Sequence, residues 1–167
     1  MARIVVALGG NALGNDPQTQ QKHVDIAADI ISSLVLMDNE VLVAHGNGPQ
    51  VGMINLAFEK GFEAGLTPMM PLAECTAMSQ GYIGYHLQQA IDQSLMSKGS
   101  RTPVITMLTQ VIVDPDDPAF ENPTKPIGSF YDENTYSKLS RSTNDIYRKF
   151  PEGYRRPRQS PDRSPEP

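Results

Sequence analysis

Two short glycine-rich turns are the residues of this chain best suited to hold an anion. The first, "GGN", occupies residues 9–11 after the apolar run 4–8, and the second, "GNG", occupies residues 46–48 after the apolar run 41–45. Glycine lacks the Cβ atom that would keep a ligand from the backbone, and an asparagine amide can donate to an oxygen. Where such a turn joins a strand to a helix, unpaired backbone N–H groups attract negative charge. Two turns facing one crevice could hold both partners of a transfer reaction.

A purely structural interpretation of these turns stays open. A single GGN turn also fits glycines that only tighten a strand-to-helix connection, although two matched turns favour a binding role. The sequence contains no G-x-x-x-x-G-K-[ST] motif, so an ordinary P-loop is not expected. The first turn also lacks the G-x-G-x-x-G spacing of a dinucleotide site.

Lys125 is the candidate catalytic residue, in the stretch "NPTKPIGSFY". Pro123 and Pro126 stiffen the chain on either side, and Gly128 lets it turn immediately afterwards. An ammonium group placed over a transferring phosphoryl group would stabilise its spread negative charge. An ordinary surface lysine is the alternative interpretation.

The remaining reactive side chains favour structural roles. His45 could act as a general base, but a histidine at a strand end is more often a hydrogen-bonded structural residue. His23 and His86 lie in helical stretches and are expected on solvated faces. Cys75 is expected to be a packing residue, and the eight methionines read as core filling. No cluster of His, Cys, Asp or Glu has metal-ligand spacing, so no metal site is predicted.

The turns need a sheet to position them, and the apolar pattern predicts one. Residues 4–8 and 41–45 read as strands buried on both faces of a parallel sheet. Apolar residues at helical spacing predict a helix over 18–37 that ends at Asp38 and Asn39, and Pro49 suits the first position of the next helix. A further helix is expected over about 71–97, a third strand region over 103–113, and a short helix after Asp132. This order predicts an α/β layered fold.

Composition excludes several classes of protein. The chain has 167 residues, 39% of them apolar, one cysteine and no apolar run long enough to cross a membrane. Residues 1–147 hold eight Lys or Arg against sixteen Asp or Glu, which argues against a nucleic-acid surface. The amino terminus shows no signal-peptide pattern. We therefore expect a cytoplasmic protein that binds neither nucleic acid nor membrane.

Five blocks in order resemble the amino-terminal half of carbamate kinase, a member of the amino-acid kinase fold group: "VVALGGNAL", "HGNGPQVG", "AMSQGYIGY", "DPDDPAF" and "KPIGSFY". The resemblance implies a three-layer αβα sandwich with a mainly parallel sheet, and a homodimer. It implies reversible phosphoryl transfer between carbamoyl phosphate and ADP, giving carbamate and ATP. Mg2+ would be carried by the nucleotide, and no other bound cofactor is expected.

The resemblance also assigns roles to residues. Gly9, Gly10 and Asn11 would meet the transferred phosphoryl group. The carbamoyl part would be held with the help of Gly46, Asn47 and Gly48. Lys125 matches a lysine of the family's active site, carried on a small subdomain that protrudes over the crevice. The helix around residues 77–87 is the candidate subunit interface, with an ordinary core helix as the alternative.

The chain also departs from the family pattern. Its match thins after Tyr136, and the family's second half, which supplies most of the nucleotide pocket, has no counterpart here. Ser129 stands where the family usually has proline. The predicted domains are 1–113, the αβα domain; 114–156, the protruding subdomain; and 157–167, a disordered Pro- and Arg-rich tail.

Three hypotheses follow for the function. In the first, the chain is a carbamate kinase or the substrate half of one, inactive or very weak alone, with a second polypeptide supplying the missing half. In the second, it is a non-catalytic remnant that dimerises with a full-length kinase. In the third, which "HGNGPQVG" and "KPIGSFY" disfavour, it is another amino-acid kinase relative that acts on a different acid or nucleotide.

Overall fold

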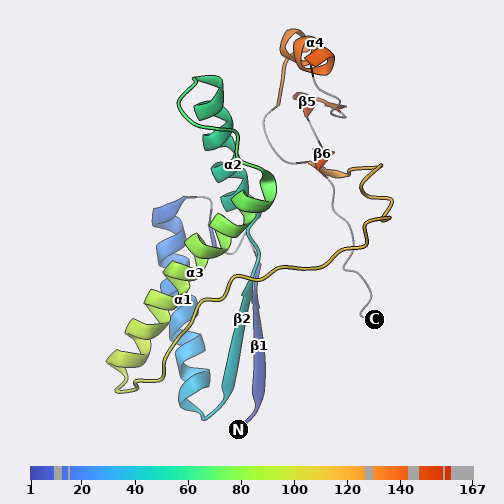
Figure 1. Cartoon of the computed structure of the whole chain (residues 1–167). Coiled ribbons are helices and arrows are strands. Elements are labelled where there is room, and N and C mark those ends of the chain that lie inside the picture. The colour runs from blue at the N-terminus through green and yellow to red at the C-terminus, as the bar shows by residue number, and fades with distance from the viewer. Residues whose placement is uncertain (10–12, 15, 127–129, 143–146, 156, 159–167) are drawn as a thin grey trace. The chain divides into compact units, whose positions relative to one another are not determined.

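The structure is a computed structural model of the chain that describes residues 1–9, 13–14, 16–126, 130–142, 147–155 and 157–158. The chain divides into two compact units, Met1–Leu108 (unit 1) and Thr109–Pro167 (unit 2). Unit 1 contains β1, α1, β2, α2 and α3, and unit 2 contains β3, α4, β4, β5 and β6 (Figure 1). Most of the predicted tail, residues 159–167, lies outside the described residues, and the predicted domain boundaries stay a prediction.

Strands β1 (Arg3–Leu8) and β2 (Glu40–His45) form a parallel pair in unit 1. Their register runs without a break from Arg3 opposite Glu40 to Leu8 opposite His45. Helix α1 (Pro17–Leu36) lies between them in the sequence, which makes the segment a strand–helix–strand unit. Both predicted strands and the α/β fold class are thereby confirmed. The predicted burial of both strand faces is wrong for the described residues, because alternate side chains such as Val5 and Leu42 are 69% and 53% exposed.

The core of unit 1 lies between one face of this strand pair and helices α1 and α3 (Leu72–Ser97). Alternate strand residues point into it, because successive side chains of a strand face opposite sides. Its buried members come from the first loop, α1 and α3: Leu13, Val24, Ala28, Ile31, Ile83, Leu87, Ala90, Ile91 and Leu95. Four strand residues pack against them: Val6, Leu8, Val41 and Val43. The apolar stripe predicted for α1 is therefore confirmed.

The predicted end of α1 is also confirmed. Asp38 takes a positive φ of 62°, which a helix cannot contain. The side chain of Asn39 donates to the Leu34 carbonyl at 3.0 Å and accepts from the Ala2 N–H at 3.0 Å. This asparagine therefore closes the helix and holds the start of β2 beside the start of β1.

Helix α2 (Gly48–Glu63) begins with Pro49 in its first turn, as predicted. Helix α3 allows a close approach at Gly84, where a Cβ atom would collide with the Thr106 side chain. The Thr106 hydroxyl donates to the Gly84 carbonyl at 3.0 Å. Gly84 thus lets the Thr106 side chain pack closely against α3, while among the described residues nothing lies within 4 Å of the position a Cβ would take at Gly81.

The strand predicted over 103–113 is not a strand of the structure. No residue from 101 to 112 belongs to a strand, and the Thr106 N–H donates to the Gln88 side chain at 3.1 Å rather than to a neighbouring strand. Val104 packs against the core, whereas Ile105 and Met107 are 78% and 69% exposed. The pattern has the alternation of a strand, but a strand also needs a hydrogen-bonded neighbour.

The prediction that methionines fill the core is wrong. Seven of the eight are exposed: Met1, Met37, Met53, Met69, Met78, Met96 and Met107. Branched aliphatic residues and alanine fill the core of unit 1 instead. Much apolar surface of the described residues is therefore open to solvent.

Unit 2 is built from short pieces. Strand β3 (Lys125–Pro126) pairs antiparallel with β6 (Pro157–Arg158), and β4 (Arg148–Phe150) pairs antiparallel with β5 (Gly153–Arg155). The short helix predicted after Asp132 is confirmed as α4 (Glu133–Ser142). The rings of Tyr136 and Tyr154 stack with their centroids 3.9 Å apart, which joins α4 to β5.

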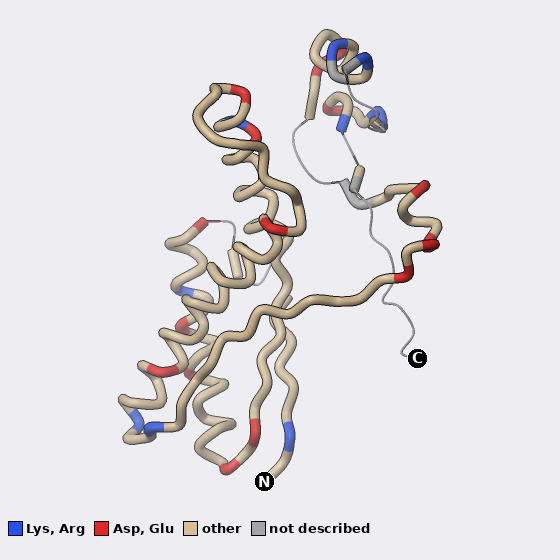
Figure 2. Tube along the Cα trace, in the orientation of Figure 1, with Lys and Arg blue, Asp and Glu red and all other residues tan. Residues whose placement is uncertain are grey.

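Charge is sparse on the strand pair, as Figure 2 shows. Its only charged residues are Arg3 and Glu40, at the amino-terminal ends, and their side chains form an ion pair of 2.7 Å. Among the described helices, none combines the length and apolar character needed to span a membrane.

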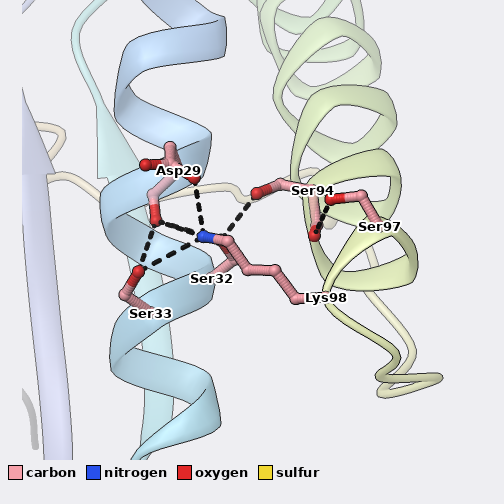
Figure 3. Close-up of polar contacts among 6 residues, drawn as sticks. All are labelled: Asp29, Ser32, Ser33, Ser94, Ser97 and Lys98. Carbon is pink, nitrogen blue, oxygen red and sulfur yellow. Dashed lines mark hydrogen bonds and ion pairs between the residues drawn. The ribbon is translucent and has the colours of Figure 1, made fainter.

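Lys98, at the carboxyl-terminal end of α3, links α3 to α1 (Figure 3). The Lys98 ammonium contacts the Asp29 carboxylate at 2.6 Å and donates to the Asp29 carbonyl at 3.0 Å and the Ser32 hydroxyl at 2.8 Å. Ser32 is fully buried, and its hydroxyl shares a 2.7 Å hydrogen bond with that of Ser94. One cation thereby links the end of α3 to α1, next to the hydrogen bond between Ser32 and Ser94.

We predict that Lys98→Met lowers the free energy of unfolding by about 1 kcal/mol, because the stem is kept while charge-assisted hydrogen bonds between two helices are lost. Lys60→Met is the matched control, since Lys60 pairs with Glu63 within one exposed turn of α2. Urea denaturation followed by circular dichroism measures both. Equal stability of the two variants would contradict the role given to Lys98.

Candidate functional site

Both glycine turns leave the same edge of the sheet. Leu8 and His45 are opposite each other at the ends of parallel strands, so the residues that follow them are neighbours. The Gly46 N–H donates to the Leu8 carbonyl at 2.8 Å, which continues the strand pairing into the second turn. This N–H is therefore already used, and the second turn can offer a ligand only the groups that follow it.

The first turn is described in part. Gly9 is exposed, and no atom of the described residues lies within 4 Å of the position a Cβ would take there. Gly10 and Asn11, the other predicted phosphate ligands, lie outside the described residues. The chain returns to the core at Leu13, which is 1% exposed. Gly14 then takes a φ of 77°, where a Cβ would stand 2.8 Å from the Thr19 side chain.

The amino terminus of α1 is already occupied by a carboxylate. Asp16 caps the helix, and one of its oxygens accepts from the N–H groups of Gln18 at 3.0 Å and Thr19 at 2.9 Å. Hydrogen bonds from the Thr19 hydroxyl and N–H hold the pKa of Asp16 below its usual value. The expectation that the helix after the first turn offers free N–H groups is therefore wrong for these two residues.

The amino terminus of α2 is different, because no side chain caps it. Asn47 stands at the N-cap position, yet its side chain makes no capping hydrogen bond. The Asn47 amide instead donates to the Ser79 hydroxyl at 2.8 Å, and Ser79 donates to the Thr76 carbonyl at 2.6 Å. Nothing lies within 4 Å of the position a Cβ would take at Gly48. The first turn of α2 is thus the more open of the two for an anion.

Two buried glutamines connect the turns, and the sequence patterns did not point to them. The side chain of Gln50, 3% exposed, donates to the Gly14 carbonyl at 3.0 Å and to the Gln20 side chain at 3.2 Å. Gln50 lies in the first turn of α2 and Gln20 in the first turn of α1, so this contact fixes the second glycine turn against the end of the first. Within the described part of the chain, the side-chain nitrogen of Gln20 and the side-chain oxygen of Gln50 have no hydrogen-bond partner. Ser79 is the third residue missed, since only its contact with Asn47 reveals it.

The histidines and the cysteine take the structural roles expected of them, with one exception. One ring nitrogen of His45 lies 3.1 Å from the Gly46 carbonyl, and Cys75 is fully buried. His23 is exposed. His86 is not simply solvated, because a ring nitrogen lies 2.9 Å from the Gln21 side chain and Tyr82 and Tyr85 meet its ring edge to face.

Lys125 lies in unit 2, in strand β3 opposite Arg158. The backbone of Lys125 is therefore held in a short antiparallel strand pair, which is consistent with a loop that Pro123 and Pro126 stiffen. The turns belong to unit 1. The catalytic role of Lys125 stays a prediction. Among the described residues, no group of three His, Cys, Asp or Glu is arranged to hold a metal ion.

Comparison with known proteins shows the family to which this chain belongs. The model of the amino acid kinase family matches residues 2–114. The carbamate kinase-like protein YqeA of Escherichia coli is 51% identical over 95% of this chain, and a carbamate kinase of Staphylococcus epidermidis is 46% identical over 96%. The chain spans about half the length of these curated relatives, 52% of each.

Solved structures agree with this result. The carbamate kinase of Giardia lamblia bound to AMP-PNP superposes on 98% of this chain with a TM-score of 0.89 and 40% identity, over 53% of its own length. The same kinase thiocarbamoylated by disulfiram gives a TM-score of 0.89 over 55% of its length. The chain therefore resembles the amino-terminal half of these kinases, as its sequence motifs indicate.

We predict that Gln50→Leu lowers the free energy of unfolding by about 1–3 kcal/mol, because the Gly14 carbonyl and the Gln20 oxygen lose a buried donor. Gln89→Leu, on the exposed face of α3, is the control and should stay within about 0.5 kcal/mol of the wild type. Chemical denaturation provides the comparison. If both variants are equally stable, Gln50 does not connect the two turns.

Proposed function

Because the chain belongs to the amino acid kinase family, we propose that it forms part of a carbamate kinase-like phosphotransferase. Such an enzyme would move a phosphoryl group reversibly between carbamoyl phosphate and ADP. The observation that carries the proposal is the parallel register of β1 and β2, which brings both glycine turns to one edge of the sheet. The likeness to named carbamate kinases supports the choice of substrates.

In the proposed reaction, the bond between phosphorus and the carbamate oxygen breaks, and a terminal oxygen of ADP forms a new bond to the same phosphorus. Carbamate leaves with the electron pair of the broken bond. Negative charge spreads over the phosphoryl oxygens during transfer, so fixed N–H donors and a cation are what a protein can usefully supply.

We assign the groups of this chain accordingly. Gly9, Gly10 and Asn11 would donate to the phosphoryl oxygens, while the open start of α2 at Gly48 would donate to the carbamoyl end. Gly46 would act through its place in the turn rather than through its N–H, which Leu8 already accepts. Ser79 supports this assignment because it holds the Asn47 side chain in place.

Lys125 would add the ammonium group. Its role rests on the resemblance of "KPIGSFY" to the family's motif, together with the stiff pairing of β3 with β6.

The nucleotide and its metal would be bound elsewhere. One solved relative, the carbamate kinase of Giardia lamblia, is bound to AMP-PNP, which supports ATP and ADP as the proposed co-substrates. We propose that Mg2+ enters with the nucleotide, since the described residues offer it no cluster of carboxylates. We further propose that the part of the kinase beyond this chain's match, here called the complementing half, supplies the nucleotide pocket and is needed for turnover.

The proposed assembly is a cytoplasmic homodimer. Its candidate interface is the outer side of α3, where Met78, Tyr85 and Met96 share one face and are 39%, 61% and 70% exposed. Gly81 on the same helix leaves room for a partner's side chain, because nothing lies within 4 Å of its missing Cβ.

Titration with carbamoyl phosphate tests the anion site directly. We expect amide shifts in nuclear magnetic resonance spectra at residues 9–11 and at Gly48, with a smaller shift at Gly46, whose N–H is already bonded within the protein. Inorganic phosphate should compete at the same amides. Shifts confined to other parts of the chain would refute the assignment of the turns.

Replacement of Lys125 tests the catalytic assignment. We expect the chain alone to form little ATP from carbamoyl phosphate and ADP, and to form ATP readily when co-produced with the complementing half of the Escherichia coli relative. In that complex, Lys125→Ala should lower turnover roughly 100-fold or more. Lys138→Ala, a change at an exposed residue of α4, is the control and should have no effect. Full turnover by the Lys125 variant would remove this lysine from the mechanism.

A further inference from the structure

The hairpin formed by β4 and β5 in unit 2 sets two arginines directly opposite each other. The two strands pair antiparallel, with Arg148 opposite Arg155 and Lys149 opposite Tyr154. Side chains at directly opposite positions of a strand pair lie on the same face, with their Cβ atoms about 5 Å apart. The two guanidinium groups therefore start from neighbouring points on one face of the hairpin.

This arrangement of charge costs stability when nothing is bound. Like charges at directly opposite positions destabilise a strand pair. Arginine does not lose its proton in proteins, so the repulsion between Arg148 and Arg155 persists at every pH at which the chain is folded. An anion between two guanidinium groups removes the repulsion and accepts charge-assisted hydrogen bonds from both. The opposed arginines therefore favour a bound anion.

The two faces of the hairpin have different neighbours. Tyr154 stacks on Tyr136 of α4 with the ring centroids 3.9 Å apart, and its hydroxyl donates to the Glu133 carboxylate at 3.2 Å. The face that carries Tyr154 is therefore packed against α4. Because successive side chains of a strand point to opposite sides, Arg148 and Arg155 lie on the other face.

Neutral groups contact both arginine side chains. The guanidinium carbon of Arg155 lies 4.7 Å from the centre of the Phe130 ring, and Phe130 meets Phe150 edge to face with the centroids 6.0 Å apart. Arg148 donates to the side-chain oxygen of Asn122 at 3.4 Å. An aromatic ring and an amide thus orient the two guanidinium groups, and neither contact supplies a negative charge.

The backbone beneath the arginines is fixed on both sides of β5. Tyr131 and Tyr154 exchange two backbone hydrogen bonds, of 2.7 and 2.8 Å, so β5 has a neighbour opposite β4 as well. Gly153 takes a φ of 133°, and a Cβ atom there would stand 2.6 Å from the Tyr131 oxygen. A ligand that binds cations already held in place loses less affinity to ordering than one that must order them.

We propose that Arg148 and Arg155 bind a phosphate group, either as free phosphate or as part of a small organic phosphate. Each guanidinium presents its donors as a planar fork that suits two oxygens. A carboxylate has oxygens for one fork, whereas a phosphate has enough for two. Lys and Arg are frequent on α4 and the hairpin, and the described residues of 130–158 hold six of them against three Asp or Glu (Figure 2).

This inference goes beyond the proposed function. The glycine turns belong to unit 1 and the hairpin to unit 2, and the arginine pair is assigned from contacts within unit 2 alone. It therefore stands or falls independently of the phosphoryl transfer proposed above.

Titration of the full chain with inorganic phosphate tests the site without any substitution. We expect the side-chain Nε–H signals of Arg148 and Arg155 to shift together and to saturate in nuclear magnetic resonance spectra. The signal of Arg141, an exposed residue in the last turn of α4, should stay in place. Equal shifts of all three arginines would show a general attraction of anions and overturn the proposal, as would no shift at all.

Substitutions then test the geometry of the pair. Arg148→Gln and Arg155→Gln should each weaken phosphate binding at the hairpin roughly tenfold or more, because charge-assisted hydrogen bonds are lost. Arg141→Gln removes the same charge from α4 and is the matched control, so it should bind as the wild type does. Arg148→Lys keeps the charge without the fork and should also bind more weakly. Wild-type affinity in that variant would refute recognition by paired forks.

A repeat of the titration with AMP distinguishes the two sources of the phosphate group. Tighter binding of AMP than of inorganic phosphate at the same arginine signals would identify an organic phosphate as the ligand. Equal or weaker binding of AMP would identify free phosphate. The ring signals of Tyr136 and Tyr154 show in each variant whether the hairpin is still packed on α4.

The same spectra separate this inference from the proposed function. Shifts at Arg148 and Arg155 without shifts at residues 9–11 and Gly48 would leave the arginine site standing and refute the anion site at the turns. Shifts at the turns without shifts at the two arginines would do the reverse.

Discussion

The parallel register of β1 and β2 is the constraint on which the rest of the molecule depends. It places Leu8 opposite His45, so that both glycine turns emerge at one edge, and the Gly46 N–H extends the pairing into the second turn. A shift of β1 by one residue against β2 would turn its inward side chains outward and bury Val5 in place of Val6. The core against α1 and α3 therefore fixes the register, and the register fixes the site.

The two turns are not equivalent once the structure is considered. Asp16 occupies the start of α1 and brings a negative charge, which disfavours a second anion there. The start of α2 has no such cap, because Asn47 reaches Ser79 instead. Gln50 then ties the open helix to Gly14 at the end of the first turn. We propose that an anion is held chiefly by the start of α2 and by the first turn, with the buried glutamines Gln20 and Gln50 connecting the two.

Sequence periodicity was sufficient to predict the elements whose own residue spacing determines their conformation. Strands β1 and β2, the stripe of α1 and the start of α2 at Pro49 follow from spacing and from proline's missing N–H. Periodicity gave a wrong prediction where a strand depends on a hydrogen-bonded partner. Residues 103–112 have the alternation of a strand, but the structure assigns no strand to them. Gln20, Gln50 and Ser79 could not be found from spacing, because their roles depend on contacts between distant parts of the chain. The prediction that methionines fill the core was wrong for a related reason, because the hydrophobicity of a side chain does not show whether another surface will cover it.

The pairing of β1 with β2 gathers both glycine turns at one edge of the sheet. Scalar coupling across the hydrogen bond between the Gly46 nitrogen and the Leu8 carbonyl carbon, measured by nuclear magnetic resonance on the labelled chain, reports that pairing at its decisive point. The account predicts a measurable coupling between these two atoms and slow exchange of the Gly46 amide hydrogen. Coupling of Gly46 to a different carbonyl, or exchange as fast as that of an unpaired amide, would contradict it.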